Sequence, residues 1–100
     1  MSKIILRLYV IGKTRLSANA TKNLKNILEK NFTDRYELEI IDLSENPELA
    51  EKDKILAVPA VVRKLPPPIQ KIVGDLSDEE KVLVGLDLVP EKNSRRKTGQ

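Results

Sequence analysis

Two side chains that commonly perform chemistry near neutral pH, the cysteine thiol and the histidine imidazole, are missing from this sequence. Their absence excludes disulfides, thiol redox chemistry, thiolate or imidazole metal sites, and every nucleophile built on a Ser–His or Cys–His pair. We therefore expect no redox or hydrolytic activity, and we identify no catalytic, cofactor-binding or metal-binding residue. The composition favours a binding protein over an enzyme.

The basic side chains are the next candidates, because a sequence pI near 9.2 suggests nucleic-acid binding. Residues 91–100 hold four basic side chains and one acidic, whereas the first 90 residues hold 14 of each sign. Only three aromatic residues, Tyr9, Phe32 and Tyr36, could stack on bases. The excess positive charge therefore belongs to a tail, and we expect no nucleic-acid partner.

Alternating apolar residues predict a strand over residues 4–11, apolar on both faces and therefore central in its sheet. Ser17 is a plausible N-cap for a helix whose apolar residues recur at helical spacing up to Phe32. A second alternating run, residues 36–42, predicts a strand in which Tyr36, Leu38 and Ile40 face inward. Together these segments predict a right-handed βαβ unit with parallel strands.

The second half predicts a short charged helix from Pro47 to Leu56, then a hairpin of residues 57–64 and 69–73 around Pro66 to Pro68. With a last element after Ser77, the order is βαβαββα, an α/β arrangement of the thioredoxin-like type. In that fold a cis proline commonly opens the third strand, and Pro59 occupies its place. The loop of residues 12–15, where a redox member would carry two thiols, has none.

The segment of residues 82–89 supports two structures. Val82, Val84, Leu86 and Leu88 alternate as in a strand, whereas Val82, Leu83, Leu86 and Val89 form a helical stripe. Ser77 and Glu80 form a capping box, which favours a helix, whereas the valine content favours a strand. Composition does not choose between them.

The length of 100 residues predicts a single domain, which we place at residues 1–90, followed by a disordered basic tail at 91–100. The apolar run of residues 4–11 is interrupted by Arg7 and is too short to span a membrane. We therefore expect a cytoplasmic protein with no membrane partner.

The run NPELAEKDKILAVPAVVRKLPPPIQKIVGDLSDEEKVLVGLDL, together with LRLYVIGKT and YELEIIDL, resembles the KaiB family. The resemblance covers about residues 3–89. It implies a non-enzymatic protein that binds a KaiC-like RecA-type ATPase and modulates its cycle. It also implies two forms: a thioredoxin-like monomer that binds, and a rearranged resting form, βαββααβ, that assembles as a tetramer.

The resemblance also implies roles for single residues. Lys54 and Lys71 match basic positions on or near the docking face, although each viewed alone is an ordinary solvated charge. Gly85 and Asp87 match positions that bias the switch between the two forms. Gln70 and Lys71 stand where clock members carry two arginines, so the resemblance is compatible with a circadian clock or with a related role in stress adaptation.

Other interpretations stay open at this point. The chain could be a sensor-type domain like that of the clock-output histidine kinase, with a KaiA-like protein or such a kinase among its partners. It could be a thioredoxin-like enzyme, although no thiol is present. It could also be a structural domain for a different protein partner.

Overall fold

The computed structural model describes residues 3–33 and 35–89. Three helices and four strands follow one another in the order βαβαββα, which confirms the predicted order. Their bounds are β1 Ile4–Val10, α1 Arg15–Phe32, β2 Tyr36–Asp42, α2 Glu48–Lys52, β3 Ala60–Leu65, β4 Gln70–Val73 and α3 Glu79–Gly85.

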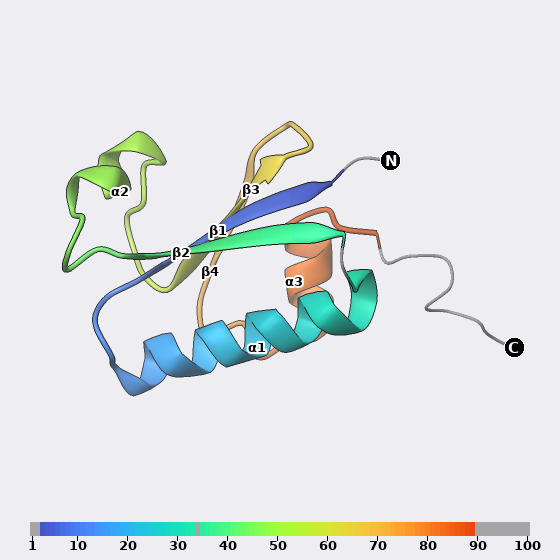
Figure 1. The fold of residues 1–100 in the computed structure, drawn as a ribbon, viewed down its shortest axis with the longest axis horizontal. Helices are drawn as coiled ribbons and strands as arrows, with labels where there is room; N and C mark the ends of the chain where they lie inside the picture. The colour runs from blue at the N-terminus through green and yellow to red at the C-terminus, as the bar shows by residue number, and fades with distance from the viewer. Residues whose placement is uncertain (1–2, 34, 90–100) are drawn as a thin grey trace, which may run out of the picture.

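The four strands form one sheet in the order β2-β1-β3-β4 (Figure 1). β1 runs parallel to β2, as the predicted βαβ unit requires, and antiparallel to β3. β3 and β4 form the predicted hairpin, with Val61 opposite Ile72. β1 is therefore a central strand, and its two faces are both available for packing.

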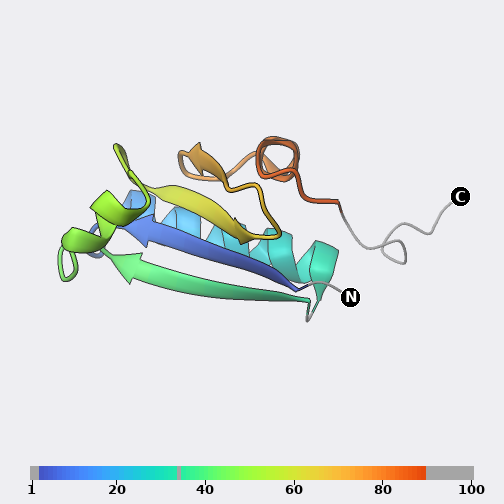
Figure 2. The ribbon, with the colours of Figure 1, turned by 90° about the horizontal axis from the view of Figure 1, so that it is seen from above.

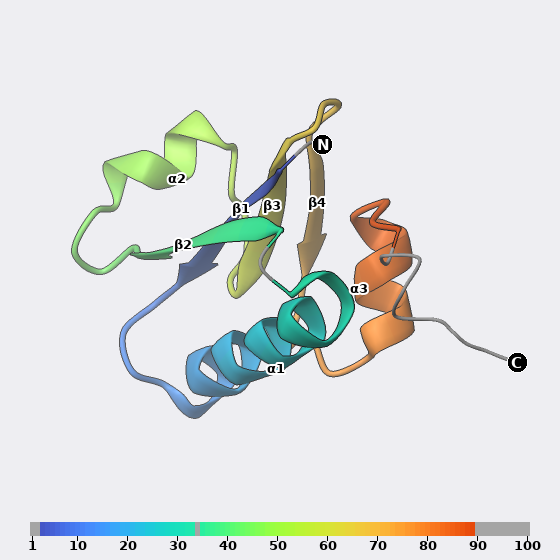
Figure 3. The same ribbon diagram turned by 45° about the vertical axis from the view of Figure 1, so that its right-hand side comes forward.

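Helices cover the two faces of the sheet unequally. α1 and α3 lie on one face, and the short α2 lies on the other near one end of the sheet (Figures 2 and 3). The larger core lies under α1 and α3 and includes Leu6, Leu8, Leu24 and Leu86. The smaller core consists of Tyr9, Ile41 and Val62, against which residues of α2 and the following loop pack.

The start of α1 differs from the prediction. The helix begins at Arg15, and the N-cap is Thr14, whose Oγ1 accepts a hydrogen bond from the Ser17 backbone N–H at 3.1 Å. Ser17 lies buried in the first turn, and its hydroxyl donates to the Ile11 carbonyl at 3.4 Å. Ser17 therefore joins the helix to Ile11, the residue after β1, while Thr14 accepts the hydrogen bond from a free backbone N–H of the first turn.

The inward face of β2 was also predicted incorrectly at one position. Ile40 is 40% exposed, whereas Ile41 is buried in the smaller core against Tyr9 and Val62. β2 is an edge strand, so only part of its α1-side face is covered, while α2 covers the opposite face at this end. Leu38 and Tyr36 pack against the larger core as expected.

α2 is shorter than predicted, because it ends at Lys52 and not at Leu56. The chain leaves the helix through Asp53, and Lys54 then adopts a φ of 54°, in the left-handed region that ends helices. The backbone N–H of Ile55 donates to the Ala50 carbonyl at 2.8 Å, which closes the turn. Residues 53–58 thus form a loop.

The predicted rigid corner at Pro66 to Pro68 is held by a buried arginine. The Arg63 guanidinium donates to the Pro66 carbonyl at 2.6 Å and to the Pro68 carbonyl at 3.2 Å. Its Nε is buried and has no hydrogen-bond partner among the described residues. Arg63 therefore fixes the tip of the hairpin from within β3.

The segment after Ser77 adopts the helical alternative up to Gly85. The N-cap is Asp78, whose carboxylate accepts from the Lys81 backbone N–H at 3.2 Å, so Ser77 is not the cap that we predicted. Val82 and Leu86 are buried as the helical stripe requires, but Val89 is 79% exposed because the helix has ended before it. The predicted tail, residues 91–100, lies outside the described residues. In the described part of the chain, no helix is long and apolar enough to cross a membrane.

Candidate docking surface

The loop of residues 12–15, where redox thioredoxins carry their thiols, makes structural hydrogen bonds. Thr14 caps α1, and the Gly12 backbone N–H donates to the Asp42 carboxylate at 2.9 Å. The peptide bond between Val58 and Pro59, which lies at the position predicted for a cis proline, is cis. Within residues 3–33 and 35–89, no three acidic, cysteine or histidine side chains come together to hold a metal ion.

Asp42 links the two loops at this end of the sheet. Besides Gly12, its Oδ1 accepts from the Ser44 hydroxyl at 2.6 Å and from the Ser44 backbone N–H at 2.9 Å. The hydrogen bond from the Ser44 hydroxyl and the two backbone donors lower the pKa of this carboxyl below its ordinary value. The carboxylate therefore has a structural role at the end of β2, like that of an Asx turn.

The two lysines implied as docking residues come together although they are far apart in the sequence. The Lys71 ammonium, on β4, donates to the backbone carbonyls of Asp53 at 2.9 Å and of Lys54 at 3.3 Å. Both lysines are exposed. Lys71 therefore attaches the loop of residues 53–58, which we call the docking loop, to the edge strand of the sheet.

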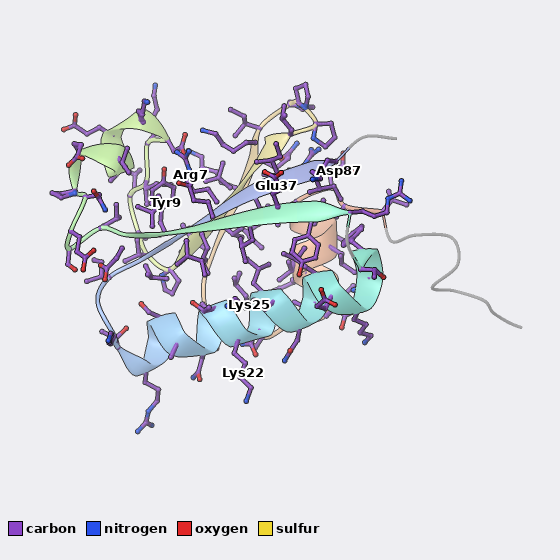
Figure 4. All side chains as sticks on the ribbon, in the orientation of Figure 1. Arg7, Tyr9, Lys22, Lys25, Glu37 and Asp87 are labelled. Atoms are coloured by element: carbon purple, nitrogen blue, oxygen red, sulfur yellow. The ribbon has the colours of Figure 1, made fainter. Side chains whose placement is uncertain are left out.

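Asp53 holds the same loop from the opposite side. Its carboxylate, whose side chain is only 6% exposed, accepts from the Tyr9 hydroxyl at 2.6 Å and from the Lys64 ammonium at 2.7 Å. The Arg7 guanidinium lies 3.5 Å from the same carboxylate and donates to the Tyr9 hydroxyl at 3.2 Å. Figure 4 shows Arg7 and Tyr9 side by side on the α2 side of the sheet.

These contacts shift the acidity of the groups involved. Burial alone raises the pKa of Asp53, but hydrogen bonds from Lys64 and Tyr9 and the nearby positive charges outweigh it, so the net pKa is lowered. The pKa of Tyr9 is raised, first by burial and then by its hydrogen bond to Asp53. Asp53 therefore remains ionised and Tyr9 remains neutral near pH 7.

Apolar side chains project from the surface beside these lysines. Leu56 is 97% exposed and Val73 is 60% exposed. They border a hollow of about 210 Å³ that is also lined by Lys54, Ala57 and Lys71. We call these five residues the docking surface: Lys54, Leu56, Ala57, Lys71 and Val73.

Lys54 and Lys71 were named in the sequence analysis from the resemblance alone, and their role in docking stays a prediction. Leu56, Val73 and the hydrogen bonds of Asp53 were not singled out there. Leu56 was assigned to the predicted helix, whereas it lies in the loop after α2. The pair Asp53-Lys54 could have indicated that the helix ends before Leu56, because a poor helix former at the end of a charged segment favours helix termination.

Gly85 and Asp87 do not belong to this surface. Gly85 is the last residue of α3, and a Cβ at that position would lie 2.5 Å from Cγ2 of Ile72 on β4. Asp87 follows the helix with a φ of 54°. In Figure 4 its side chain lies toward the N-terminal end of β1, away from Tyr9. These two residues can influence the docking surface only through the stability of α3 and its packing on β4.

Solved structures share this fold. The N-terminal domain of SasA from Synechococcus elongatus matches with a TM-score of 0.70 and 28% identity, over 84% of this chain and 81% of that one. Mitochondrial thioredoxin 3 from Saccharomyces cerevisiae matches with a TM-score of 0.68 over 87% of this chain and 79% of that one. Its identity is only 14%, so that likeness concerns the fold alone. The predicted thioredoxin-like fold is thereby confirmed.

Sequence comparison gives a closer relation. A family model described as the KaiB domain matches residues 7–88. The circadian clock oscillator protein KaiB of Microcystis aeruginosa is 56% identical over 92 residues, 92% of this chain and 88% of that protein. The circadian clock oscillator protein KaiB1 of Synechocystis is 59% identical over 85 residues, 85% of this chain and 81% of that protein. With the fold, the family model and relatives of this similarity in agreement, the chain belongs to the KaiB family.

Proposed function

We propose that this protein is a non-enzymatic regulator that docks on a KaiC-like ATPase and modulates its phosphorylation or ATPase cycle. Family membership supports a role in clock regulation, since the relatives are circadian clock oscillator proteins. The observation that carries the proposal is the docking surface itself. It joins Lys54 and Lys71 from two segments around exposed apolar side chains on an ordered loop.

The chemistry of this surface suits binding. Interfaces commonly place apolar residues at the centre and charged residues at the rim, and Leu56 and Val73 beside Lys54 have this arrangement. The ionisable groups nearby, Asp53 and Tyr9, bond to each other and to the fold. They are therefore committed to holding the loop in place and are not presented to a substrate.

A second candidate is a thioredoxin-like sensor domain with a different protein partner. The similarity to the N-terminal domain of SasA favours it, because the two share fold and 28% identity over most of both chains. Both candidates use a binding surface and neither uses redox chemistry. They differ in the partner, so competition between a KaiC-like ATPase and other clock proteins for this chain separates them.

We also propose that the described thioredoxin-like form is the binding form and exchanges with a tetrameric resting form of different fold. Gly85 and Asp87 disfavour the helical state of the last element, since glycine is a poor helix former and a negative charge is unfavourable near a helix C-terminus. Sedimentation across a concentration series tests the assembly. A chain that stays monomeric up to millimolar concentration contradicts the proposed resting tetramer.

The experiment for docking is titration of a purified KaiC-like ATPase with the full chain, monitored by fluorescence anisotropy. We expect saturable binding that is weakened about tenfold by Lys54→Glu, because a lysine at the interface is replaced by the opposite charge. The matched control is Lys25→Glu, which makes the same charge change on the exposed side of α1 (Figure 4). Absence of binding by the wild-type chain contradicts the proposed function.

A further inference from the structure

We infer that Leu56 is the anchor of the docking surface, and that Lys71 positions this anchor without contacting the partner. The inference rests on the proposed function and deepens it. The partner must present an apolar pocket for one leucine side chain and, at the edge of that pocket, a carboxylate that pairs with Lys54. We expect such a pocket on the KaiC-like ATPase of the proposed function.

The first argument is the exposure of Leu56. At 97% it is the most exposed large apolar side chain in the described part of the chain. Neighbouring Ile55 packs against the smaller core beneath α2, so the loop turns one apolar residue inward and the next outward. A leucine held outward on an ordered loop leaves water only when a partner covers it, and that burial favours the complex.

The second argument is that the loop carrying Leu56 is held in place before any partner arrives. Contacts from three strands converge on Asp53: Tyr9 of β1 and Lys64 of β3 bind its carboxylate, and Lys71 of β4 binds its carbonyl. The Ile55 N–H adds a hydrogen bond to Ala50 in α2. An anchor held in its binding conformation loses less entropy on association, so it contributes more affinity.

The third argument distinguishes the two lysines. The Lys71 ammonium already donates two of its three hydrogen bonds to the carbonyls of Asp53 and Lys54. Within the described residues, the Lys54 ammonium makes no hydrogen bond or ion pair. The free cation beside Leu56 is therefore Lys54, and it calls for an anionic group on the partner.

Two other strongly exposed apolar side chains lack this combination. Val84 lies on the outer face of α3, and Ile69 lies at the tip of the hairpin. Neither lies on a loop held by contacts from several strands, and Val84 therefore serves as a matched control for Leu56.

The test uses binding of full-length variants to the KaiC-like ATPase. Leu56→Ser is expected to weaken binding more than tenfold, in the range of an interface anchor, while Leu56→Met retains most of the affinity. Val84→Ser removes a strongly exposed apolar side chain, 73% exposed, from α3 and is expected to bind like the wild type. If the wild type binds and Leu56→Ser binds equally well, the anchor is refuted and the proposed function stands. If the wild type does not bind, the proposed function fails first.

A double-mutant cycle tests the role of Lys71. Lys71→Met is expected to weaken binding, but adding it to Leu56→Ser is expected to change the affinity less than twofold, because both changes act through one anchor. Amide hydrogen exchange at residues 54–57 should become faster in Lys71→Met alone, as the loop loses its attachment. Additive losses of affinity with unchanged exchange mean that Lys71 contacts the partner directly, and they overturn the positioning role.

Discussion

Asp53 is the residue that determines the shape of the docking surface without belonging to it. Its carboxylate bonds to Tyr9 and Lys64, and its carbonyl bonds to Lys71, so one residue connects the end of α2 with three strands. A nearly buried carboxylate is costly unless it is paired, and here each oxygen has a donor. The ionised carboxylate of Asp53 therefore holds the docking loop against the sheet.

This arrangement predicts how stability depends on pH. Because the folded-state pKa of Asp53 is lowered, its contribution to stability is complete above the unfolded-state pKa and is lost as pH falls through the folded-state pKa. We expect Asp53→Asn to cost about 2 kcal/mol at pH 7 and to flatten the loss of stability in acid. Urea unfolding at pH 7 and below the ordinary aspartate value of 3.8 measures both effects.

The control for this prediction is Glu39→Gln. Glu39 accepts from Arg7 at 3.0 Å but is 58% exposed, so its ion pair is screened by solvent and is worth little. A change in the acid slope for Glu39→Gln as large as that for Asp53→Asn contradicts the role given to Asp53.

At this scale the sequence predicted some residues and missed others for definite reasons. Pro59 was found because its place in the order of elements is distinctive. Lys54 and Lys71 were named only by resemblance, since nothing local links two lysines that far apart, and their role in docking stays a prediction. Asp53 was missed because its contacts come from β1, β3 and β4, which no local pattern contains.

At the scale of elements, the contact between α3 and β4 influences the stability of α3. Gly85 faces Ile72 so closely that an added methyl group would lie 2.5 Å from the Ile72 Cγ2 atom. The helix propensity gained by alanine, about 1 kcal/mol, is therefore opposed by this contact. The glycine that weakens the helix also allows it to pack on the strand.

The two effects can be separated by a double-mutant cycle. We expect Gly85→Ala to be more favourable by about 1 kcal/mol in an Ile72→Ala background than in the wild type, because the opposing methyl group is gone. Val84→Ala, at the exposed neighbouring position, should have the same effect in both backgrounds. Equal effects of Gly85→Ala in the two backgrounds show that Ile72 does not limit the helix.

The element order was predictable, whereas several ends were not. The order βαβαββα follows from apolar periodicity and proline placement, which are local signals. The start of α1 at Arg15 and the end of α2 at Lys52 depend on which side chain reaches a free backbone group. The choice of helix for Glu79–Gly85 depends on packing against β4, which the periodicity of residues 82–89 could not show.

At the scale of the whole molecule, the main core lies apart from the proposed docking surface. The large core lies beneath α1 and α3, while the docking surface lies at the edge of the opposite, smaller core. Variants at Leu56 or Lys54 can therefore change binding without weakening the main core. This separation makes binding experiments on surface variants interpretable.

The basic tail gives a prediction at the same scale. Residues 91–100 contain no apolar side chain, so they have nothing to add to either core. Deleting them is expected to leave the thermal unfolding midpoint unchanged within about 1 °C, as seen by circular dichroism at fixed ionic strength. A drop of about 5 °C or more means that the tail docks on the domain.

The most direct test of the docking account is an amide hydrogen-exchange footprint of the full chain with and without a KaiC-like ATPase. The predicted result is slower exchange in the docking loop, residues 53–58, and in residues 71–73 of β4, with little change along the outer face of α1. Protection confined to α1 and β2, with the docking loop exchanging as fast as in the free chain, contradicts the account.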